Sequence, residues 1–512
     1  MTEIRYYQFT DSHGSFYYHD PIHNVVQWHF PLGSKVINFE TGLEVNEGPK
    51  PSGNVTKFKL DNQTPHASFS LKPRNSSKTI RTPISKKGSL SNLFSISYIS
   101  GKETENASYY PPRLIEDRNK QFDISLLSAN LNVKRSLFRP KAQDYDRHLS
   151  YEDNMQPNNA PLLKTTEPFP KAAQELFKFI LDYCKPGSKL LPSGLIPLVN
   201  NDPILIDELY AQILKVLRNN PNIDYRIKGW ELFCVTCSIY RIDPQSVNAQ
   251  NGFNSLLCSF IANSTRDPTR GISHFALISY IRFTSQKSLQ YTNDELDQWI
   301  HRTSLGFKPI GSCLYEHLWF QRSTSPNCPI PIILHELCQG LLAKKDEMSN
   351  GALLAEGRAA DIEALITTLN NNLNNNNAEV LKTTSVRDIM SVIKKWLILL
   401  PNPIIPSEFF DQLIECEPQN YIEFVNKLPD LHKNTLIYII GFLRDLSKLQ
   451  EITNMSESAL ALKFGPSIIN PNPKDAQIVH QIAITAKKFM LELLHNLDVV
   501  SVYPLPDSAF TL

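Results

Sequence analysis

One stretch between residues 385 and 406 constrains the fold more than any other part of the chain. Ser385 with Asp388 resembles the capping box that opens helices. Pro401 and Pro403 end the stretch, because proline cannot continue a helix. Between them, apolar residues recur at intervals of three and four, which places them on one helical face: Ile389, Val392, Ile393, Trp396, Leu397 and Leu400. The stretch predicts an amphipathic helix with one face in a core.

Similar helical spacing runs through the chain from about residue 161. Phe177, Ile180 and Leu181 mark one helix, and Asn219-Asn220-Pro221 ends another. The apolar face of that second helix consists of Ile206, Leu209, Tyr210, Ile213 and Leu217. A chain of 512 residues is too long for one core. We therefore expect a mainly α, multidomain protein.

Residues 1–35 follow a different pattern, with many aromatic residues separated by turn residues at 11–14 and at Asp20-Pro21. Short β-prone segments divided by turns are typical of antiparallel strands. This pattern predicts a small three-stranded antiparallel sheet.

Residues 36–160 lack sustained periodicity and are rich in Ser, Asn, Lys and Pro. Such a composition cannot bury enough apolar surface to offset the entropy of ordering the chain. We therefore predict a disordered linker over 36–160.

Charge and cysteine content narrow the classes of function. The formal net charge of +1 argues against a dominant role in nucleic-acid binding. The 8 scattered cysteines suit a reducing, cytoplasmic compartment. Cys234 and Cys237 have no partner pair, so we expect buried thiols instead of a zinc site, which needs four ligands. We expect neither a metal nor a cofactor. We also expect no transmembrane segment, because the apolar runs are too short to span a bilayer.

Three blocks in the last third of the chain resemble the signatures of the RhoGAP domain, an all-helical domain that docks on Rho-family GTPases. The blocks are residues 351–365, 394–406 and 455–466. Laid without a gap on the family's first block, both of its glycines match, the second at Gly357, and the catalytic arginine falls on Leu354. The family's lysine–arginine pair falls on Lys394 and Ile398, and its asparagine falls on Ala459.

The resemblance implies a RhoGAP-like domain over 304–500, followed by a C-terminal tail over 501–512. It also implies that Lys394, Ile398 and Ala459 face the GTPase. An inserted arginine typically accelerates GTP hydrolysis about 10³- to 10⁵-fold by stabilising charge on the phosphoryl group. Leu354 offers neither charge nor donor, so we expect a regulatory protein with little or no activating ability. The alternative is an active domain that uses Arg358, one helical turn beyond Leu354, as the substitute.

The segments 207–212, 220–222 and 229–232 resemble the core signature of the MyTH4 domain, an all-helical bundle found in cytoskeletal proteins. We place this domain over 161–303. Some relatives bind microtubules through basic residues. Such contacts here would use Lys215, Arg218, Arg226 and Lys228, unless these form an ordinary solvated face.

Residues 14–31 resemble the WW domain, in which two aromatic walls hold a proline-rich peptide. Tyr17 and Trp28 would form the slot, while Tyr6 stands where the family has its structural tryptophan. The alternative is a small aromatic core without a ligand.

Modules in this order resemble the Vilse/CrossGAP group of Rho GTPase-activating proteins. That resemblance implies a role in small GTPase signal transduction and cytoskeletal regulation, with a Rho/Rac-type GTPase as partner. Further partners would be a proline-rich peptide and microtubules or actin, and the location would be cytoplasmic or cytoskeleton-associated. Three functions remain open: a catalytic activator, a scaffold that binds GTPases without catalysis, and a cytoskeletal adaptor acting through the MyTH4 domain.

Overall fold

The structure is a computed structural model that describes residues 5–10, 16–20, 25–27, 35–38, 45, 109–133, 141–157, 160–269, 271–298, 305–348, 352–372, 377–469 and 476–510. The chain divides into two compact units, residues 1–105 and residues 106–512.

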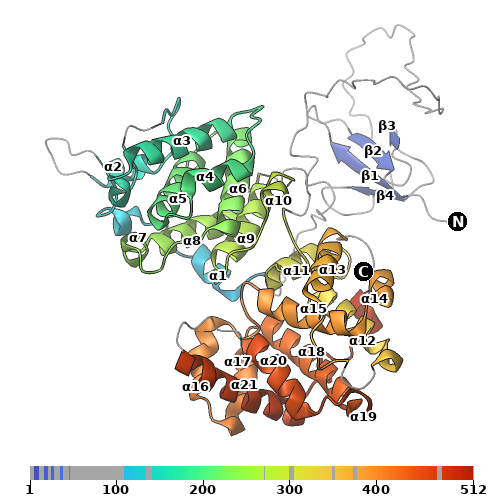
Figure 1. Ribbon diagram of the computed structural model, residues 1–512. Coiled ribbons are helices and arrows are strands. Elements are labelled where there is room, and N and C mark those ends of the chain that lie inside the picture. The colour runs from blue at the N-terminus through green and yellow to red at the C-terminus, as the bar shows by residue number, and fades with distance from the viewer. Residues whose placement is uncertain are drawn as a thin grey trace, which may run out of the picture. The chain divides into compact units, whose positions relative to one another are not determined.

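The first unit contains a sheet whose described strands are β1 (Arg5–Thr10), β2 (Phe16–Asp20), β3 (Val25–Gln27) and β4 (Lys35–Asn38). They lie in the order β3-β2-β1-β4 (Figure 1). β2 pairs antiparallel with both β1 and β3, as the sequence predicts. β4 instead pairs parallel to β1, with Tyr6 opposite Val36. The predicted three-stranded sheet is therefore wrong in strand number, and β4 extends into the predicted linker.

Inside this sheet Tyr18 and Val36 are buried, and Gln8 Nε2 donates a hydrogen bond of 3.2 Å to the Tyr18 hydroxyl. Trp28 and the side chain of Tyr17 lie outside the described residues, so the peptide slot stays a prediction.

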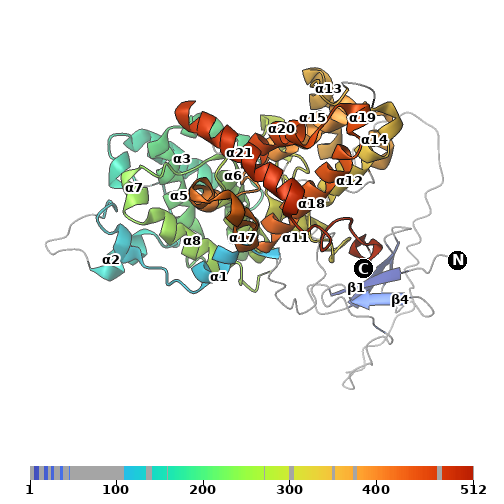
Figure 2. The same cartoon turned by 90° about the horizontal axis from the view of Figure 1, so that it is seen from below.

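The second unit begins with ordered structure inside the predicted disordered linker. α1 (Pro112–Arg118) packs along α8 in both views (Figures 1 and 2). The Tyr280 hydroxyl donates 2.7 Å to Asp117 Oδ2. Leu114, Leu127 and Leu149 are fully buried. The linker prediction is therefore wrong for residues 109–133 and 141–157, because isolated apolar residues there gain burial only by packing on distant helices. The remainder of the predicted linker, apart from 36–38 and 45, lies outside the described residues.

Helices α1–α10 form what we call the first bundle. They are α1, α2 (Ala142–His148), α3 (Pro170–Cys184), α4 (Leu195–Val199), α5 (Pro203–Leu217), α6 (Ile223–Ile239), α7 (Val247–Gln250), α8 (Phe253–Ser264), α9 (Ile272–Phe283) and α10 (Asn293–Gln298).

Local chemistry explains the boundaries of the central helices in this bundle. The side chains of Asp202 and Asn222 accept hydrogen bonds from the first turns of α5 and α6. Asn219 ends α5 in a left-handed conformation, at φ 58°. Trp230 is 1% exposed and stacks on Phe260, with ring centroids 5.5 Å apart, so it belongs to the core. Cys234 and Cys237 on α6 are buried thiols, as predicted.

Helices α11–α21 form the second bundle. They are α11 (Leu314–Gln321), α12 (Ile332–Leu342), α13 (Ala359–Asn371), α14 (Ala378–Thr383), α15 (Val386–Leu399), α16 (Phe410–Glu415), α17 (Tyr421–Lys427), α18 (Asp430–Ser447), α19 (Gln450–Thr453), α20 (Glu457–Ile469) and α21 (Ala476–Asn496).

Helix α15 confirms the amphipathic helix predicted from the sequence. The Ser385 side chain caps the helix by accepting a hydrogen bond of 3.1 Å from the Asp388 backbone N–H. Trp396 is fully buried, and its Nε1 donates 3.1 Å to the carbonyl of Pro309. The helix ends at Leu399, just before the two prolines.

The residues after α21 are packed, and do not form a separate tail as predicted. Tyr503 is 8% exposed, and its hydroxyl donates 2.6 Å to Asp445 Oδ2 on α18. A Cβ on Gly441 would lie 2.3 Å from Tyr503 Cγ, so glycine leaves room for the ring. Residues up to 510 therefore complete the second bundle. In the described part of the chain, no helix is both long and apolar enough to cross a membrane.

Candidate functional site

The loop at residues 352–358, just before α13, is held by two other helices of the second bundle. Lys463 Nζ on α20 donates a hydrogen bond of 2.8 Å to the carbonyl of Leu353, and it lies 3.4 Å from the carbonyl of Leu354. Lys394 Nζ on α15 donates 2.7 Å to Glu356 Oε1. Leu353 is fully buried while Leu354 is 53% exposed, so the fixed loop presents the Leu354 side chain to solvent.

Charge pairing under the loop shifts two ionisable groups. The hydrogen bond from Lys394 holds the pKa of Glu356 below its ordinary value. Burial lowers the pKa of Lys463, and the neighbouring Glu356 carboxylate opposes that shift. The carboxylate of Glu356 thus interacts with an ammonium group from each helix.

Gly357 is required by close packing between the loop and α15. A Cβ at this position would lie 2.2 Å from Asp388 Oδ1 and 3.3 Å from Asp388 Cα. The backbone N–H of Gly357 also donates 2.9 Å to Ser391 Oγ. Since no larger residue fits without movement, this contact accounts for the second glycine of the first sequence block.

The structure brings the predicted contact positions onto the elements around this loop. Lys394 and Ile398 lie one turn apart on α15, and Ile398 is 38% exposed. Ala459 lies one turn before Lys463 on α20 and is half-buried. Leu462, which the sequence reasoning did not single out, is 59% exposed.

Arg358 lies at the N-cap of α13, outside the loop's contacts with α15 and α20. Its Nε donates 2.6 Å to Asp361 Oδ2 and its Nη2 donates 3.1 Å to Asp361 Oδ1. The side chain is 84% exposed. Hydrogen bonding to Asp361 raises the pKa of Arg358, which therefore stays charged. The guanidinium is thus directed at its own helix by an i, i+3 pair of the kind common on helix surfaces.

Lys463 is a functional candidate that the sequence reasoning missed. It stands in the run Leu460-Ala-Leu-Lys463-Phe464, where its neighbours on both sides are apolar. A partly buried charged residue in an apolar run needs a partner. This requirement could have identified Lys463 from the sequence. Its partner, the carbonyl of Leu353, could not have been identified in this way, because it is more than 100 residues away in the chain.

The side chain that the loop presents to solvent at residue 354 is apolar and carries neither a charge nor a hydrogen-bond donor. Leu354 on the loop, Ile398 on α15 and Leu462 on α20 are exposed apolar side chains, and Lys394 and Lys463 on the same two helices already donate hydrogen bonds. An exposed apolar cluster edged by polar groups is typical of a protein-binding site.

In the first bundle, the four basic residues considered for microtubule contact all have internal partners. Lys215 Nζ donates 3.0 Å to the carbonyl of His148 and 3.1 Å to that of Ser150. Lys228 Nζ pairs with Glu231 Oε2 at 2.9 Å. Neither lysine is an unengaged surface cation.

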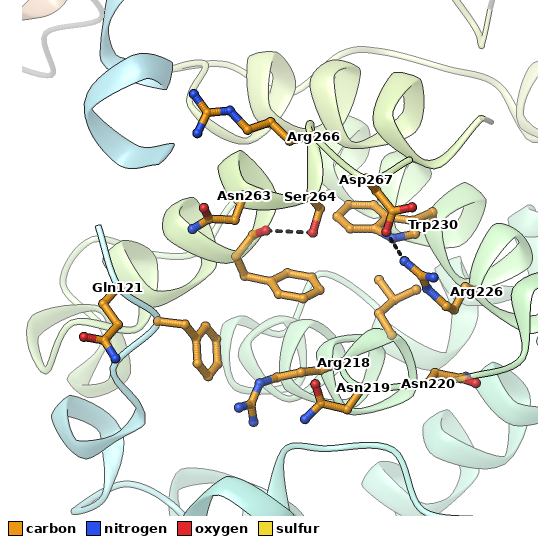
Figure 3. A pocket seen from close by; sticks show the side chains of 13 residues that line it. Gln121, Arg218, Asn219, Asn220, Arg226, Trp230, Asn263, Ser264, Arg266 and Asp267 are labelled. Atoms are coloured by element: carbon orange, nitrogen blue, oxygen red, sulfur yellow. Dashed lines mark hydrogen bonds and ion pairs between the residues drawn. The ribbon is translucent and has the colours of Figure 1, made fainter. Parts of the chain in front are cut away.

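The two arginines of this set line a cavity of about 650 Å³ (Figure 3). Arg226 points at Asp267 and forms an ion pair with it, as Figure 3 shows. Arg218 pairs with Asp146. Other lining residues are the aromatic and amide side chains of Phe122, Asn219, Asn220, Trp230, Phe260 and Asn263, and an exposed third arginine, Arg266. Arg218 and Arg226 form ion pairs within the bundle, so these two arginines do not form an ordinary solvated face.

Comparison with known proteins assigns the two bundles. Residues 331–473 match the model of the RhoGAP domain, and residues 194–296 match the model of the MyTH4 domain. The chain therefore contains a MyTH4 domain and a RhoGAP domain.

Relatives of the chain are GTPase-activating proteins. GTPase activating protein homolog 3 of Dictyostelium discoideum is 26% identical over 198 residues, covering 38% of this chain and 14% of that protein. Rho GTPase-activating protein 22 of Mus musculus is 28% identical over 124 residues, covering 22% of this chain and 18% of that protein. Rho GTPase-activating protein conundrum of Drosophila melanogaster is 26% identical over 172 residues, covering 31% and 27%. The chain thus spans less than a third of each of these relatives.

Two solved structures are also similar to parts of the chain. Human Rho GTPase activating protein 15 is 21% identical, with a TM-score of 0.31, covering 37% of this chain and 89% of that one. The MyTH4-FERM MF1 domain of Dictyostelium discoideum myosin VII (mutant 2) is 16% identical, with a TM-score of 0.29, covering 74% and 80%.

Proposed function

We propose that this chain regulates Rho/Rac-type small GTPases by binding them through its RhoGAP domain, with little or no acceleration of GTP hydrolysis. The observation that carries the proposal is Leu354. It is an exposed residue of the loop at 352–358, at the position where the RhoGAP resemblance has its catalytic arginine.

An arginine finger contributes about 10³- to 10⁵-fold in rate, which corresponds to roughly 4–7 kcal/mol of activation free energy. An alkyl side chain cannot stabilise developing phosphoryl charge. Ile398 and Ala459 also lack the polar groups that the resemblance places there. The apolar core positions of α15, by contrast, are kept and buried. Loss confined to the contact surface fits a binding protein without catalysis.

Single-turnover GTP hydrolysis tests the proposal with the full chain and a panel of Rho-type GTPases. Binding to each GTPase, loaded with a non-hydrolysable GTP analogue, is measured in parallel. We expect saturable binding to at least one member and less than about tenfold acceleration, because the finger's 10³- to 10⁵-fold term is missing. Acceleration of about a hundredfold or more would refute inactivity. Absence of binding across the panel would refute GTPase recognition.

Arg358 provides the alternative, an active domain with a substitute arginine. Its ion pair with Asp361 is exposed to solvent and therefore weak. A GTPase could displace it at small cost. If acceleration is seen, Arg358→Ala decides whether this residue is responsible.

The MyTH4 domain supports a cytoskeletal role alongside GTPase binding, as in the Vilse/CrossGAP group that the module order resembles. Direct microtubule contact through Lys215, Arg218, Arg226 and Lys228 is disfavoured because each has an internal partner. Co-sedimentation of the full chain with microtubules and with actin filaments separates the two candidate partners.

The N-terminal sheet is proposed to bind proline-rich peptides through Tyr17 and Trp28. A proline-rich peptide array tests the full chain against its Trp28→Ala variant. Binding that persists in the variant would remove the slot assignment.

A further inference from the structure

The loop that leaves α9 of the MyTH4 domain reaches the end of α15, the helix that carries Lys394 and Ile398. The backbone N–H of Gln286 donates 3.0 Å to Asn402 Oδ1, and that of Lys287 donates 3.2 Å to the carbonyl of Pro401. Two consecutive N–H groups of one domain thus bind the turn that ends a helix of the other.

The same loop is held from behind by the MyTH4 domain. Arg241, just after α6, donates 3.1 Å from Nε to the carbonyl of Ser285 and 2.8 Å from Nη2 to that of Lys287. The N–H of Leu289 donates 2.8 Å to the carbonyl of Ser238. Leu289 is 6% exposed. The loop is thus held by hydrogen bonds to both domains.

This loop places the Lys287 ammonium group beside the carbonyl of Ile398. Lys287 Nζ lies 3.5 Å from the carbonyl of Ile398, where a cation is favoured by the negative end of the helix dipole. The side chain is half-buried, and burial lowers its pKa. Within the described residues, no carboxylate forms an ion pair with Lys287, whereas Lys394 already pairs with Glu356. The charge of Lys287 is therefore available to a partner.

We propose that Lys287, although it belongs to the MyTH4 domain, is part of the surface that meets the GTPase. The partner would place an acidic side chain against Lys287 and an apolar patch against Ile398 and Leu354. This inference rests on the proposed function. It adds that both domains contact the same partner. The positive charge near Ile398, at the end of α15, then comes from a residue outside the RhoGAP domain.

The chemistry favours a contact that contributes to specificity and association rate. A positive group at the edge of an apolar patch steers an acidic partner into position, and its effect weakens as salt screens it. Lysine is also long enough to bury its alkyl chain along Ile398 while keeping its ammonium group in water.

Dissociation constants of full-chain variants for a GTPase loaded with a non-hydrolysable GTP analogue test this inference. Lys287→Glu should weaken binding about tenfold or more at low salt, because a like charge then faces the acidic partner. Lys287→Met should weaken binding less, and Lys287→Arg should preserve it. The matched control is Lys171→Glu, the same charge reversal at an exposed position of α3 in the same domain. Thermal unfolding of each variant accompanies the measurement, and Lys287→Met keeps the test valid if Lys287→Glu is unstable.

The outcomes separate the inference from the function on which it rests. If the wild type binds a GTPase and both Lys287→Glu and Lys287→Met bind it equally well, Lys287 has no role in binding, and the proposed function still stands. Equal loss in Lys287→Arg and Lys287→Glu would overturn the role of charge. Absence of wild-type binding to every GTPase would overturn both. A loss in Lys287→Glu that salt reduces, with Lys171→Glu like wild type, would support the inference.

Discussion

Arg282 on α9 and Glu316 on α11 form an ion pair between the two bundles, with Nη2 and Oε1 2.6 Å apart and neither side chain exposed to solvent. Arg282 Nη1 also donates 3.0 Å to Ser238 Oγ, and Glu316 Oε2 accepts 3.0 Å from the backbone N–H of Cys313. Both charges are thus neutralised and hydrogen-bonded inside a shared core. The MyTH4 domain and the start of the second bundle are therefore joined by buried contacts.

Removing one partner of this pair should destabilise the chain strongly. Arg282→Met leaves Glu316 buried without its cation, which typically costs about 3–5 kcal/mol. The double variant Arg282→Met/Glu316→Leu should lose less, because no charge is then left unpaired. Urea unfolding midpoints check this order. Lys382→Met is the control, since its pair with Glu379 is 68% and 81% exposed and should contribute about 0–1 kcal/mol. A double variant less stable than Arg282→Met would contradict the argument.

Gly357→Ala should displace the loop that carries Leu354. The new Cβ would lie 2.2 Å from Asp388 Oδ1, so the loop or the start of α15 must move. Overpacking of this kind typically costs about 1–3 kcal/mol. We expect weaker GTPase binding and faster hydrogen exchange in residues 352–358.

Two further variants separate the clash from a general effect of the loop. Asp388→Ala should partly restore binding in the Gly357→Ala background by removing the clashing atom. Ala355→Ser, an exposed substitution in the same loop, should behave like wild type. Normal binding by Gly357→Ala alone would show that the loop adapts freely.

Leu354→Arg alone should restore little GTPase activation. The new guanidinium would have the right chemistry, but Ile398 and Ala459 still lack the polar groups expected at the GTPase-facing surface. The triple variant with Ile398→Arg and Ala459→Asn should accelerate hydrolysis more than Leu354→Arg. Single-turnover rates over a range of protein concentrations separate affinity from chemistry. Full activation by Leu354→Arg alone would show that the docking surface was complete.

Arg358→Ala should leave GTPase binding and stability nearly unchanged. The side chain is 84% exposed, and its one described ion pair is with Asp361 on the same helix. Such exposed pairs contribute little to stability. Lys463→Met is the informative comparison, because it removes the hydrogen bond to the loop carbonyl and should weaken binding. A larger loss in Arg358→Ala than in Lys463→Met would make Arg358 the functional cation.

The buried His274 should make the chain less stable in acid. Its Nδ1 accepts a hydrogen bond of 2.9 Å from Trp319 Nε1 on α11, so the neutral ring is required. Burial, with Arg322 and Arg282 nearby, lowers its pKa from 6.5 to about 3. Because the unfolded state takes up this proton first, stability should fall as the pH drops below 6.5, by up to about 1.4 kcal/mol per pH unit.

His274→Gln tests this prediction through the pH dependence of the urea midpoint between pH 7 and pH 4. The variant should show a shallower decline, by about one proton. Some slope should remain, because burial also lowers the pKa of His317 to about 3 and that of His432 to about 4. An unchanged slope would mean that His274 titrates normally in the folded chain.

Local pattern was sufficient to predict helix α15. Its apolar stripe, the Ser385 cap and the proline stop are interactions within one turn or one face, so residues 385–403 contain the information. The position of Leu354 in a glycine-bounded block was likewise readable from the sequence. The glycine itself could be matched, but its cause, Asp388 across the loop, could not.

Weakly patterned segments could not be predicted in the same way. Residues 109–133 have the composition of a linker, yet Leu114 and Leu127 are fully buried. The free energy that orders them comes from apolar surface on α8 and its neighbours, far along the chain. A composition argument considers only the segment itself, and so it predicted disorder.

The sequence by itself determined the strongly periodic helices such as α15, the presence of the MyTH4 and RhoGAP domains, and the identity of Leu354, because each depends on local spacing and residue identity. Only the tertiary structure decided which charges meet. Lys463 reaches the Leu353 carbonyl, Lys287 reaches the end of α15 and Arg282 reaches Glu316 across separations that range from 34 to 111 positions in the chain. Electrostatic pairing acts through space, and its strength depends on burial and distance, neither of which is written in residue spacing.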